Sequence, residues 1–121
     1  MDLAGLQQLL QRVAGARVVA VGDLMVDRFV YGEVARISAE APIPVMARTW
    51  ENVMLGAAGN VARNVAALGG EVALVGVIGK DGGGREAKDL IAAEPRIEGY
   101  LITDPDRPTT IKTRFVSRIA A

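Results

Sequence analysis

Two runs of β-branched and small apolar residues, 17–21 and 71–78, limit the folds open to this chain of 121 residues. Each run is short, is almost free of polar residues and is followed by glycine, which is typical of a strand buried on both faces of a parallel sheet. The spacing of apolar residues predicts helices over 2–14, 56–68 and 85–93. Since strands and helices alternate, we expect an α/β layer with right-handed crossovers.

The pattern of apolar residues over 29–50 differs from that in the rest of the chain. Apolar residues alternate irregularly there around Ala41-Pro-Ile-Pro44. Because proline cannot donate to a strand ladder, the segment predicts two edge-type strands that project from the main sheet as a flap.

The remaining segments predict two more strands, over 97–103 and 109–119, with a turn at 104–108 between them. The glycine run 82–84 is interpreted as a flexible loop. The last strand pattern stops at Ala121 without a turn or a polar tail, so we expect the chain to be part of a longer protein.

The composition removes several classes of chemistry. The chain has no cysteine and no histidine, which excludes disulfides, thiolate nucleophiles, zinc fingers and Ser-His-Asp triads, but leaves an all-carboxylate magnesium site open. Fourteen basic residues balance fourteen acidic ones, which argues against a nucleic-acid partner. The longest uncharged stretch, 52–62, is shorter than the roughly 18 apolar residues of a membrane span. With no signal-peptide pattern, the expected location is the cytoplasm.

The most suggestive local feature is the carboxylate pair Asp23 and Asp27. We expect both to lie just past the C-terminal end of the first buried strand, where open α/β sheets bind ligands. An ionised carboxylate only accepts hydrogen bonds, so it suits the vicinal hydroxyls of a sugar. Asp23 is equally well explained as a turn residue or a helix cap, whereas Asp27 is better placed for a ligand.

Two further groups of residues are candidates for binding. Gly56 opens the second long helix, where small residues allow close approach of a ligand, and Asn60 and Asn64 share one helical face. These amides either bind hydroxyls or cap a neighbouring loop. The basic residues Arg36, Lys112 and Arg114 either hold a phosphate or lie on a solvated strand face. Neither a P-loop nor a Gly-x-Gly-x-x-Gly fingerprint is present.

Five motifs taken together resemble one family. They are Gly22-Asp-Leu-Met-Val-Asp-Arg28, the run from Arg36 to Val45, Gly56-Ala-Ala-Gly-Asn-Val-Ala-Arg-Asn64, Leu74-Val-Gly-Val-Ile-Gly79 and Arg107-Pro-Thr-Thr-Ile-Lys-Thr-Arg114. In this order they are similar to the D-glycero-β-D-manno-heptose-7-phosphate kinases of the ribokinase-like carbohydrate kinases. One departure is Ala57, which stands where the family commonly has a second glycine. Another is the glycine run 82–84, where an acidic and small-residue turn is more usual.

The resemblance implies a fold and a function. The fold would be the N-terminal portion of a ribokinase-like kinase domain, with a mainly parallel sheet flanked by helices and a projecting β lid (29–50 and 109–119) that often pairs two subunits. Asp27 would grip sugar hydroxyls, and Gly56 and Asn60 would line the same pocket. The parent protein would phosphorylate the anomeric hydroxyl of the heptose 7-phosphate from ATP with Mg²⁺.

The resemblance also identifies what the chain lacks. The family's Gly-Ala-Gly-Asp motif, which supplies the catalytic base, its Asn-x-x-Glu magnesium motif and its nucleotide pocket are absent, so these 121 residues are expected to bind neither ATP nor Mg²⁺ and to be inactive alone. Two alternatives stay open: another sugar kinase of the same fold, and a non-enzymatic sugar-binding or dimerisation module.

Overall fold

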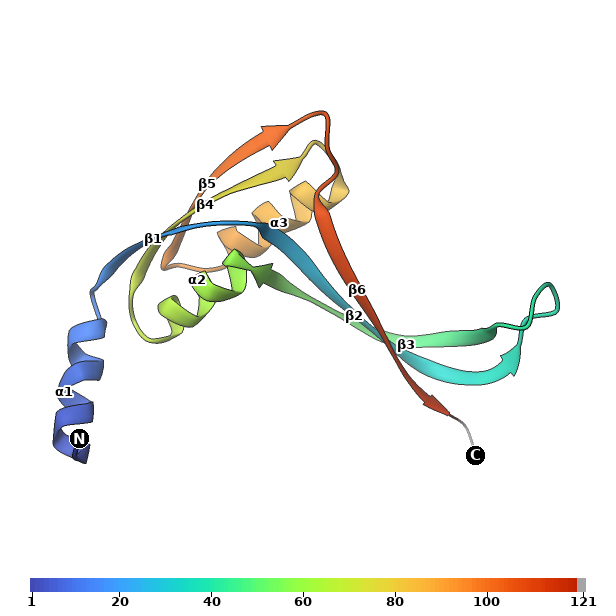
Figure 1. Cartoon of the computed structure of the whole chain (residues 1–121), viewed down its shortest axis with the longest axis horizontal. Helices are drawn as coiled ribbons and strands as arrows, with labels where there is room; N and C mark the ends of the chain where they lie inside the picture. Colours follow the sequence, from blue (N-terminus) through green and yellow to red (C-terminus); the bar gives the residue numbers. More distant parts are fainter. Residues whose placement is uncertain (120–121) are drawn as a thin grey trace.

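The structure, a computed structural model, describes residues 1–119, which form two three-stranded sheets and three helices (Figure 1). The elements are α1 (Leu3–Val13), β1 (Arg17–Val21), β2 (Leu24–Ile37), β3 (Pro44–Ala57), α2 (Ala58–Ala67), β4 (Glu71–Gly79), α3 (Gly82–Ala92), β5 (Ile97–Asp104) and β6 (Thr110–Ile119). One sheet has the parallel order β1-β4-β5. The other has the order β3-β2-β6, in which β2 runs antiparallel to β3 and parallel to β6. The predicted α/β class is confirmed.

A single hydrophobic core joins the two sheets to α2 and α3. Successive residues of β4 alternate between a buried face, with Val72 and Leu74, and a less buried face, as the two-residue period of a strand requires. Val26 of β2 and Leu55 of β3 belong to the same cluster as Ala62 of α2. The base of the β3-β2-β6 sheet is therefore held by the core.

The outer part of the β3-β2-β6 sheet projects from this core as the expected lid (Figure 1). Its strands are longer than predicted, because β2 and β3 run unbroken from the core to the tip, with bulges in their pairing after Tyr31 and Val34. In the described part of this sheet β3 and β6 are the edge strands and β2 is central, so the expectation of two edge strands is wrong for β2. Pro44 starts β3, a position at which proline is tolerated.

Two helices begin elsewhere than predicted. The second starts at Ala58, so Gly56 lies in β3 and not in a helix. The third starts at Gly82, because the Asp81 side chain accepts a hydrogen bond from the Gly84 amide at 2.8 Å and caps its first turn. The interpretation of residues 82–84 as a loop is therefore wrong.

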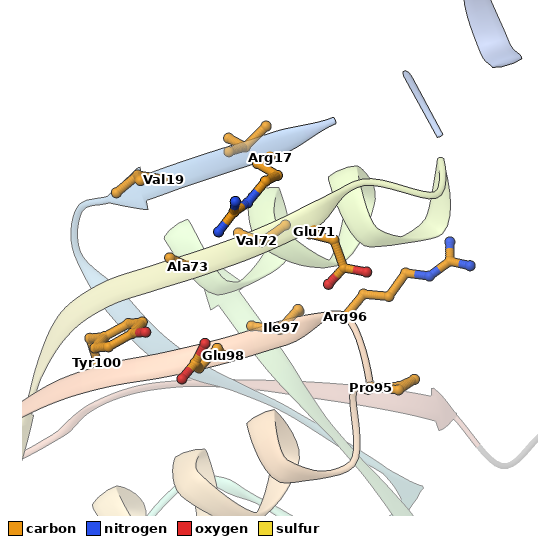
Figure 2. Close-up of a pocket in the computed structure, with 11 residues that line it drawn as sticks. Arg17, Val19, Glu71, Val72, Ala73, Pro95, Arg96, Ile97, Glu98 and Tyr100 are labelled. Carbon is orange, nitrogen blue, oxygen red and sulfur yellow. The ribbon is translucent and has the colours of Figure 1, made fainter. Parts of the chain in front are cut away.

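One face of the β1-β4-β5 sheet is uncovered. Helices α2 and α3 lie on the other face (Figure 1), so Val21 of β1 is 74% exposed and Ile102 of β5 is 62% exposed. Figure 2 shows the hollow of about 800 Å³ on this sheet, with Val19 and Tyr100 on its outer strands. The prediction that 17–21 is buried on both faces is wrong for the described residues, because burial depends on a covering layer as well as on the strand's own sequence.

Helix α1 has no buried residue, although it is amphipathic and falls within the predicted range 2–14; the Asp2 side chain caps its start. Among residues 1–119, no helix combines the length and the apolar character needed to cross a membrane.

We expect the isolated 121-residue chain to associate through the uncovered sheet face, since exposed apolar patches of this kind drive self-association. The variant Val21→Lys/Ile102→Lys should lower both light scattering and binding of a hydrophobic dye. A matched control is Val61→Lys/Leu68→Lys, which adds the same charge at two exposed apolar residues outside this face. The expectation would be contradicted if both variants had equal effects. It would also be contradicted if the unsubstituted 121-residue chain were monomeric and bound no dye.

Candidate functional site

Four of the eight candidate residues, Asp27, Gly56, Lys112 and Arg114, lie on one face of the β3-β2-β6 sheet. Asp27 of β2 lies opposite Met54 of β3 and Lys112 of β6 in the strand register. Two residues further along β2, Phe29 lies opposite Arg114. Because side chains alternate between the faces of a sheet, Asp27, Phe29, Lys112 and Arg114 all project from the same face. We call this the Asp27 face.

The Asp27 carboxylate lies directly against the backbone of Gly56. A Cβ at position 56 would lie 2.6 Å from the carboxylate carbon, closer than any stable contact allows. Only glycine at this position therefore permits the observed place of the Asp27 side chain. Both residues were candidates in the sequence, but Asp27 was expected just past the end of a strand, whereas it lies within β2.

Asp27 has an ionic neighbour but retains hydrogen-bonding capacity. Its Oδ1 atom lies 3.3 Å from Lys112 Nζ, and the side chain is only 16% exposed. The same oxygen is buried and accepts no geometrically acceptable hydrogen bond from any residue in the described part of the chain. Lys112 Nζ and Asp27 Oδ1 are therefore close enough for an ion pair, but they are not aligned as a hydrogen bond. A buried carboxylate oxygen without a donor favours a ligand that donates one.

Beyond Asp27 the same face carries aromatic rings and a second cation. The Arg114 guanidinium carbon lies 5.5 Å from the centre of the Phe29 ring, within the range of a cation–π contact. The Tyr31 and Trp50 rings stack with their centres 4.2 Å apart, so they pack against each other across β2 and β3.

Asn52 is a residue that sequence reasoning missed. It lies opposite Phe29 in the register and is half-buried, so its amide belongs to the Asp27 face. The sequence contained a signal for Asn52. Residues 52, 54 and 56 lie on the same face of a strand because of its two-residue period, and Gly56 was already a candidate.

Asp23 occupies the connection between β1 and β2. Its side chain is exposed, and its backbone carbonyl accepts a hydrogen bond from the Ala58 amide at 2.9 Å. The first turn of α2 is thus held by the backbone of Asp23, and a ligand-binding role for its carboxylate stays a prediction.

Asn60 and Asn64 share one face of α2, as the sequence predicted. They are exposed and line a hollow of about 430 Å³ with Arg63 and residues 94–96. That hollow does not include Asp27, so contact of Asn60 with the same ligand as Asp27 stays a prediction.

Arg36 lies far from the other candidates within one chain. It is exposed near the outer end of β2, opposite Val45. It follows Asp27 by nine residues (36 − 27) of one strand, which corresponds to about 30 Å at the rise of an extended chain. A role for Arg36 at an Asp27 site of the same chain therefore has no support in this arrangement.

Comparison with known proteins identifies the family. Residues 16–119 match the model of the pfkB family of carbohydrate kinases. The chain belongs to this family. The ribokinase-like resemblance of its motifs is thereby confirmed.

Curated relatives are similar over nearly the whole chain. A bifunctional protein HldE from Caulobacter sp. (strain K31) is 56% identical over 112 residues, which cover 93% of this chain and 23% of the relative. Another from Rhodopseudomonas palustris (strain HaA2) is 58% identical over 109 residues, which cover 90% of this chain and 22% of that protein. The chain therefore spans less than a quarter of the length of these relatives.

Solved structures share the fold. A carbohydrate kinase from Agrobacterium tumefaciens superposes with a TM-score of 0.65 at 24% identity, covering 85% of this chain and 32% of that one. The phosphofructokinase-2 from Escherichia coli in complex with fructose 6-phosphate gives a TM-score of 0.61 at 20% identity, covering 84% and 31%.

The described residues do not themselves fit the magnesium ion that carbohydrate kinases use with ATP. Within residues 1–119, no three His, Cys, Asp or Glu side chains lie close enough together to hold a metal ion. We therefore assign no step to Mg²⁺ through these residues.

Ala57 is strained at the point where β3 gives way to α2. Its backbone has φ 51° and ψ −122°, and it is the only described residue other than glycine with a positive φ. Such a conformation suits glycine and costs an L-residue about 1–3 kcal/mol. This explains why glycine is the common residue at position 57 in the kinases that the motifs resemble.

Replacing Ala57 with glycine should stabilise the protein. The variant Ala57→Gly removes the strain but adds unfolded-state entropy, so we expect the free energy of unfolding to rise by about 1 kcal/mol. Urea-induced unfolding measures the change. The neighbouring variant Ala58→Gly, at the first residue of α2, is the matched control and should lower stability by about 0.5–1 kcal/mol. A loss of stability in both variants would show that residue 57 is not strained.

Proposed function

We propose that this chain is the sugar-binding N-terminal part of a kinase that transfers a phosphoryl group from ATP to the anomeric hydroxyl of D-glycero-β-D-manno-heptose 7-phosphate. The observation that carries the proposal is the Asp27 carboxylate seated over Gly56, with Lys112 and Arg114 on the same face. The similarity to proteins named HldE and the five motifs support the choice of heptose within the carbohydrate kinases.

The Asp27 face matches the two ends of such a substrate. The free acceptor capacity of Asp27 suits the vicinal hydroxyls near the reacting carbon, and the amide of Asn60 is proposed to bind them as well. Lys112 and Arg114 provide positive charge for the 7-phosphate, because guanidinium and ammonium groups both bind phosphate oxygens. Arg114 lies two residues further toward the lid tip than Lys112. The phosphate end of the substrate is therefore proposed to lie toward the lid tip, and the sugar hydroxyls beside Asp27.

The reaction needs groups that this segment does not provide. A base must take the proton of the anomeric hydroxyl as its oxygen attacks the γ-phosphorus, while ADP leaves; bound Mg²⁺ would neutralise charge on the transferred group. We propose that the base and the ATP site belong to the C-terminal part of the parent protein, and that residues 1–121 alone are inactive. The parent would act in the cytoplasm, in the synthesis of ADP-heptose for surface polysaccharide.

The lid also supports pairing of two subunits. On the sheet face opposite Asp27, an apolar groove of about 770 Å³ is lined by Val30, Val34, Met46 and Phe115, and Phe115 is 71% exposed. We propose that two copies of the parent protein form a dimer through this outer face of the lid, since an apolar groove so exposed favours burial by a partner.

The carboxylate of Asp27 is the first test of the sugar site. In the parent kinase, Asp27→Asn should lower kcat/KM for heptose 7-phosphate by about 10- to 100-fold, the loss expected for hydrogen bonds to a charged group, and leave the KM for ATP unchanged. Asp106→Asn, in an exposed turn, is the control and should have no effect. Unchanged kinetics of Asp27→Asn would reject the site. Turnover of ribose or fructose 6-phosphate in place of the heptose would favour another sugar kinase.

The two cations should distinguish phosphorylated from unphosphorylated sugar. We expect Lys112→Met and Arg114→Met each to raise the KM for heptose 7-phosphate by about tenfold, while unphosphorylated heptose is affected about twofold or less, because only the phosphate loses a charged partner. Lys88→Met removes an exposed lysine of α3 and serves as the charge-matched control. Equal effects on both sugars would place the phosphate elsewhere.

A further inference from the structure

A part-buried polar contact joins the turn before α3 to the segment that starts β6. The Asp81 carboxylate accepts hydrogen bonds from the Thr109 hydroxyl at 2.6 Å and the Thr109 amide at 2.8 Å, in addition to the Gly84 amide. The Thr109 hydroxyl in turn accepts from the Gly79 amide at 2.9 Å. We call these bonds the Asp81–Thr109 latch.

The latch is built into the packing of the fold. Thr109 is only 6% exposed and is the one buried polar residue in the described part of the chain. A Cβ on Gly79 would collide with the backbone carbonyl oxygen of Arg107, so glycine there lets the two segments touch. The hydrogen bond from the Thr109 hydroxyl lowers the pKa of the Asp81 carboxyl most, and the bonds from the backbone amides of Thr109 and Gly84 lower this pKa further. The carboxyl therefore stays ionised and acts as an acceptor.

Strand β6 has few other features that set its register. It is an edge strand bonded to β2, and the side chains of residues 110–118 are all exposed. Register is weakly specified in a strand without a buried face, and a slip of one residue would turn every side chain to the opposite face. Such a slip would remove Lys112 and Arg114 from the Asp27 face.

We propose that the Asp81–Thr109 latch is a positioning device that sets the start of β6 and thereby holds Lys112 opposite Asp27. Thr109 is adjacent to Thr110, the first paired residue of β6, and three residues before Lys112. Asp81 and Thr109 are positioning residues that act through Lys112 and Arg114. The inference rests on the proposed function, because the effect is read through binding of the sugar phosphate.

The test uses the parent kinase with a conservative pair at position 109. Thr109→Val removes the hydroxyl and should raise the KM for heptose 7-phosphate about tenfold, with the KM for ATP changed by less than about twofold. Thr109→Ser keeps the hydroxyl and should return the sugar KM to within about twofold of the unmodified kinase. Hydrogen exchange should become faster at the amides of 110–114 in Thr109→Val, and remain unchanged in α2.

A double-variant cycle separates positioning from general stability. If the latch acts through Lys112 and Arg114, Thr109→Val should cause little further rise of the sugar KM in a Lys112→Met/Arg114→Met background. An equal rise in both backgrounds, or a lower melting temperature with an unchanged sugar KM, would overturn the proposal. Should Thr109→Val fail to fold, Asp81→Asn takes its place in the same cycle, with the same outcomes.

The failure of the latch and the failure of the proposed function have different signatures. If Asp27→Asn impairs heptose phosphorylation but Thr109→Val does not change the sugar KM, the latch is wrong and the function stands. If the parent kinase does not phosphorylate heptose 7-phosphate, the proposed function is wrong, and the exchange rates of 110–114 still test whether the latch holds β6.

Discussion

The carboxylate of Asp27 occupies its place only because residue 56 has no side chain. This close approach buries one carboxylate oxygen beside the backbone of β3 without giving it a hydrogen-bond donor. Burial of a carboxylate oxygen that accepts no hydrogen bond is unfavourable, so a ligand that donates one would remove this cost. The strained residue Ala57 follows Gly56 directly, at the point where β3 gives way to α2.

Strand β2 connects this site to the rest of the molecule. Its first residues are part of the core, with Val26 fully buried, and its outer residues form the middle of the lid. Arg28 strengthens this junction, because it pairs with Glu51 of β3 at 3.0 Å and also with Glu86 of α3. Asp27 therefore lies where the part of β2 that is packed in the core meets the projecting lid.

The sequence was informative where local chemistry decides the structure. Helix and strand periods located α2 and β4 to within two residues, and the motifs identified Gly56 and Asp27 as partners. The sequence was misleading where contacts between residues distant in the chain decide the structure. The glycines 82–84 are helical because Asp81 caps them, and Asp81 is itself held by Thr109 across the fold. The apolar sequence of β1 predicts that Val21 is buried. Burial also requires a covering layer, which residues 1–119 do not supply.

The pair between Lys112 and Asp27 is suited to exchange for a ligand. Lys112 is 46% exposed, and an ion pair with one solvated partner contributes at most about 1 kcal/mol. In the proposed site, sugar hydroxyls replace Lys112 as the partner of Asp27, and the freed ammonium turns to the phosphate beside Arg114. Asp27 thus has an ionic partner before binding and hydrogen-bond donors after it. Because the ion pair is weak, its loss subtracts little from the affinity that the phosphate provides.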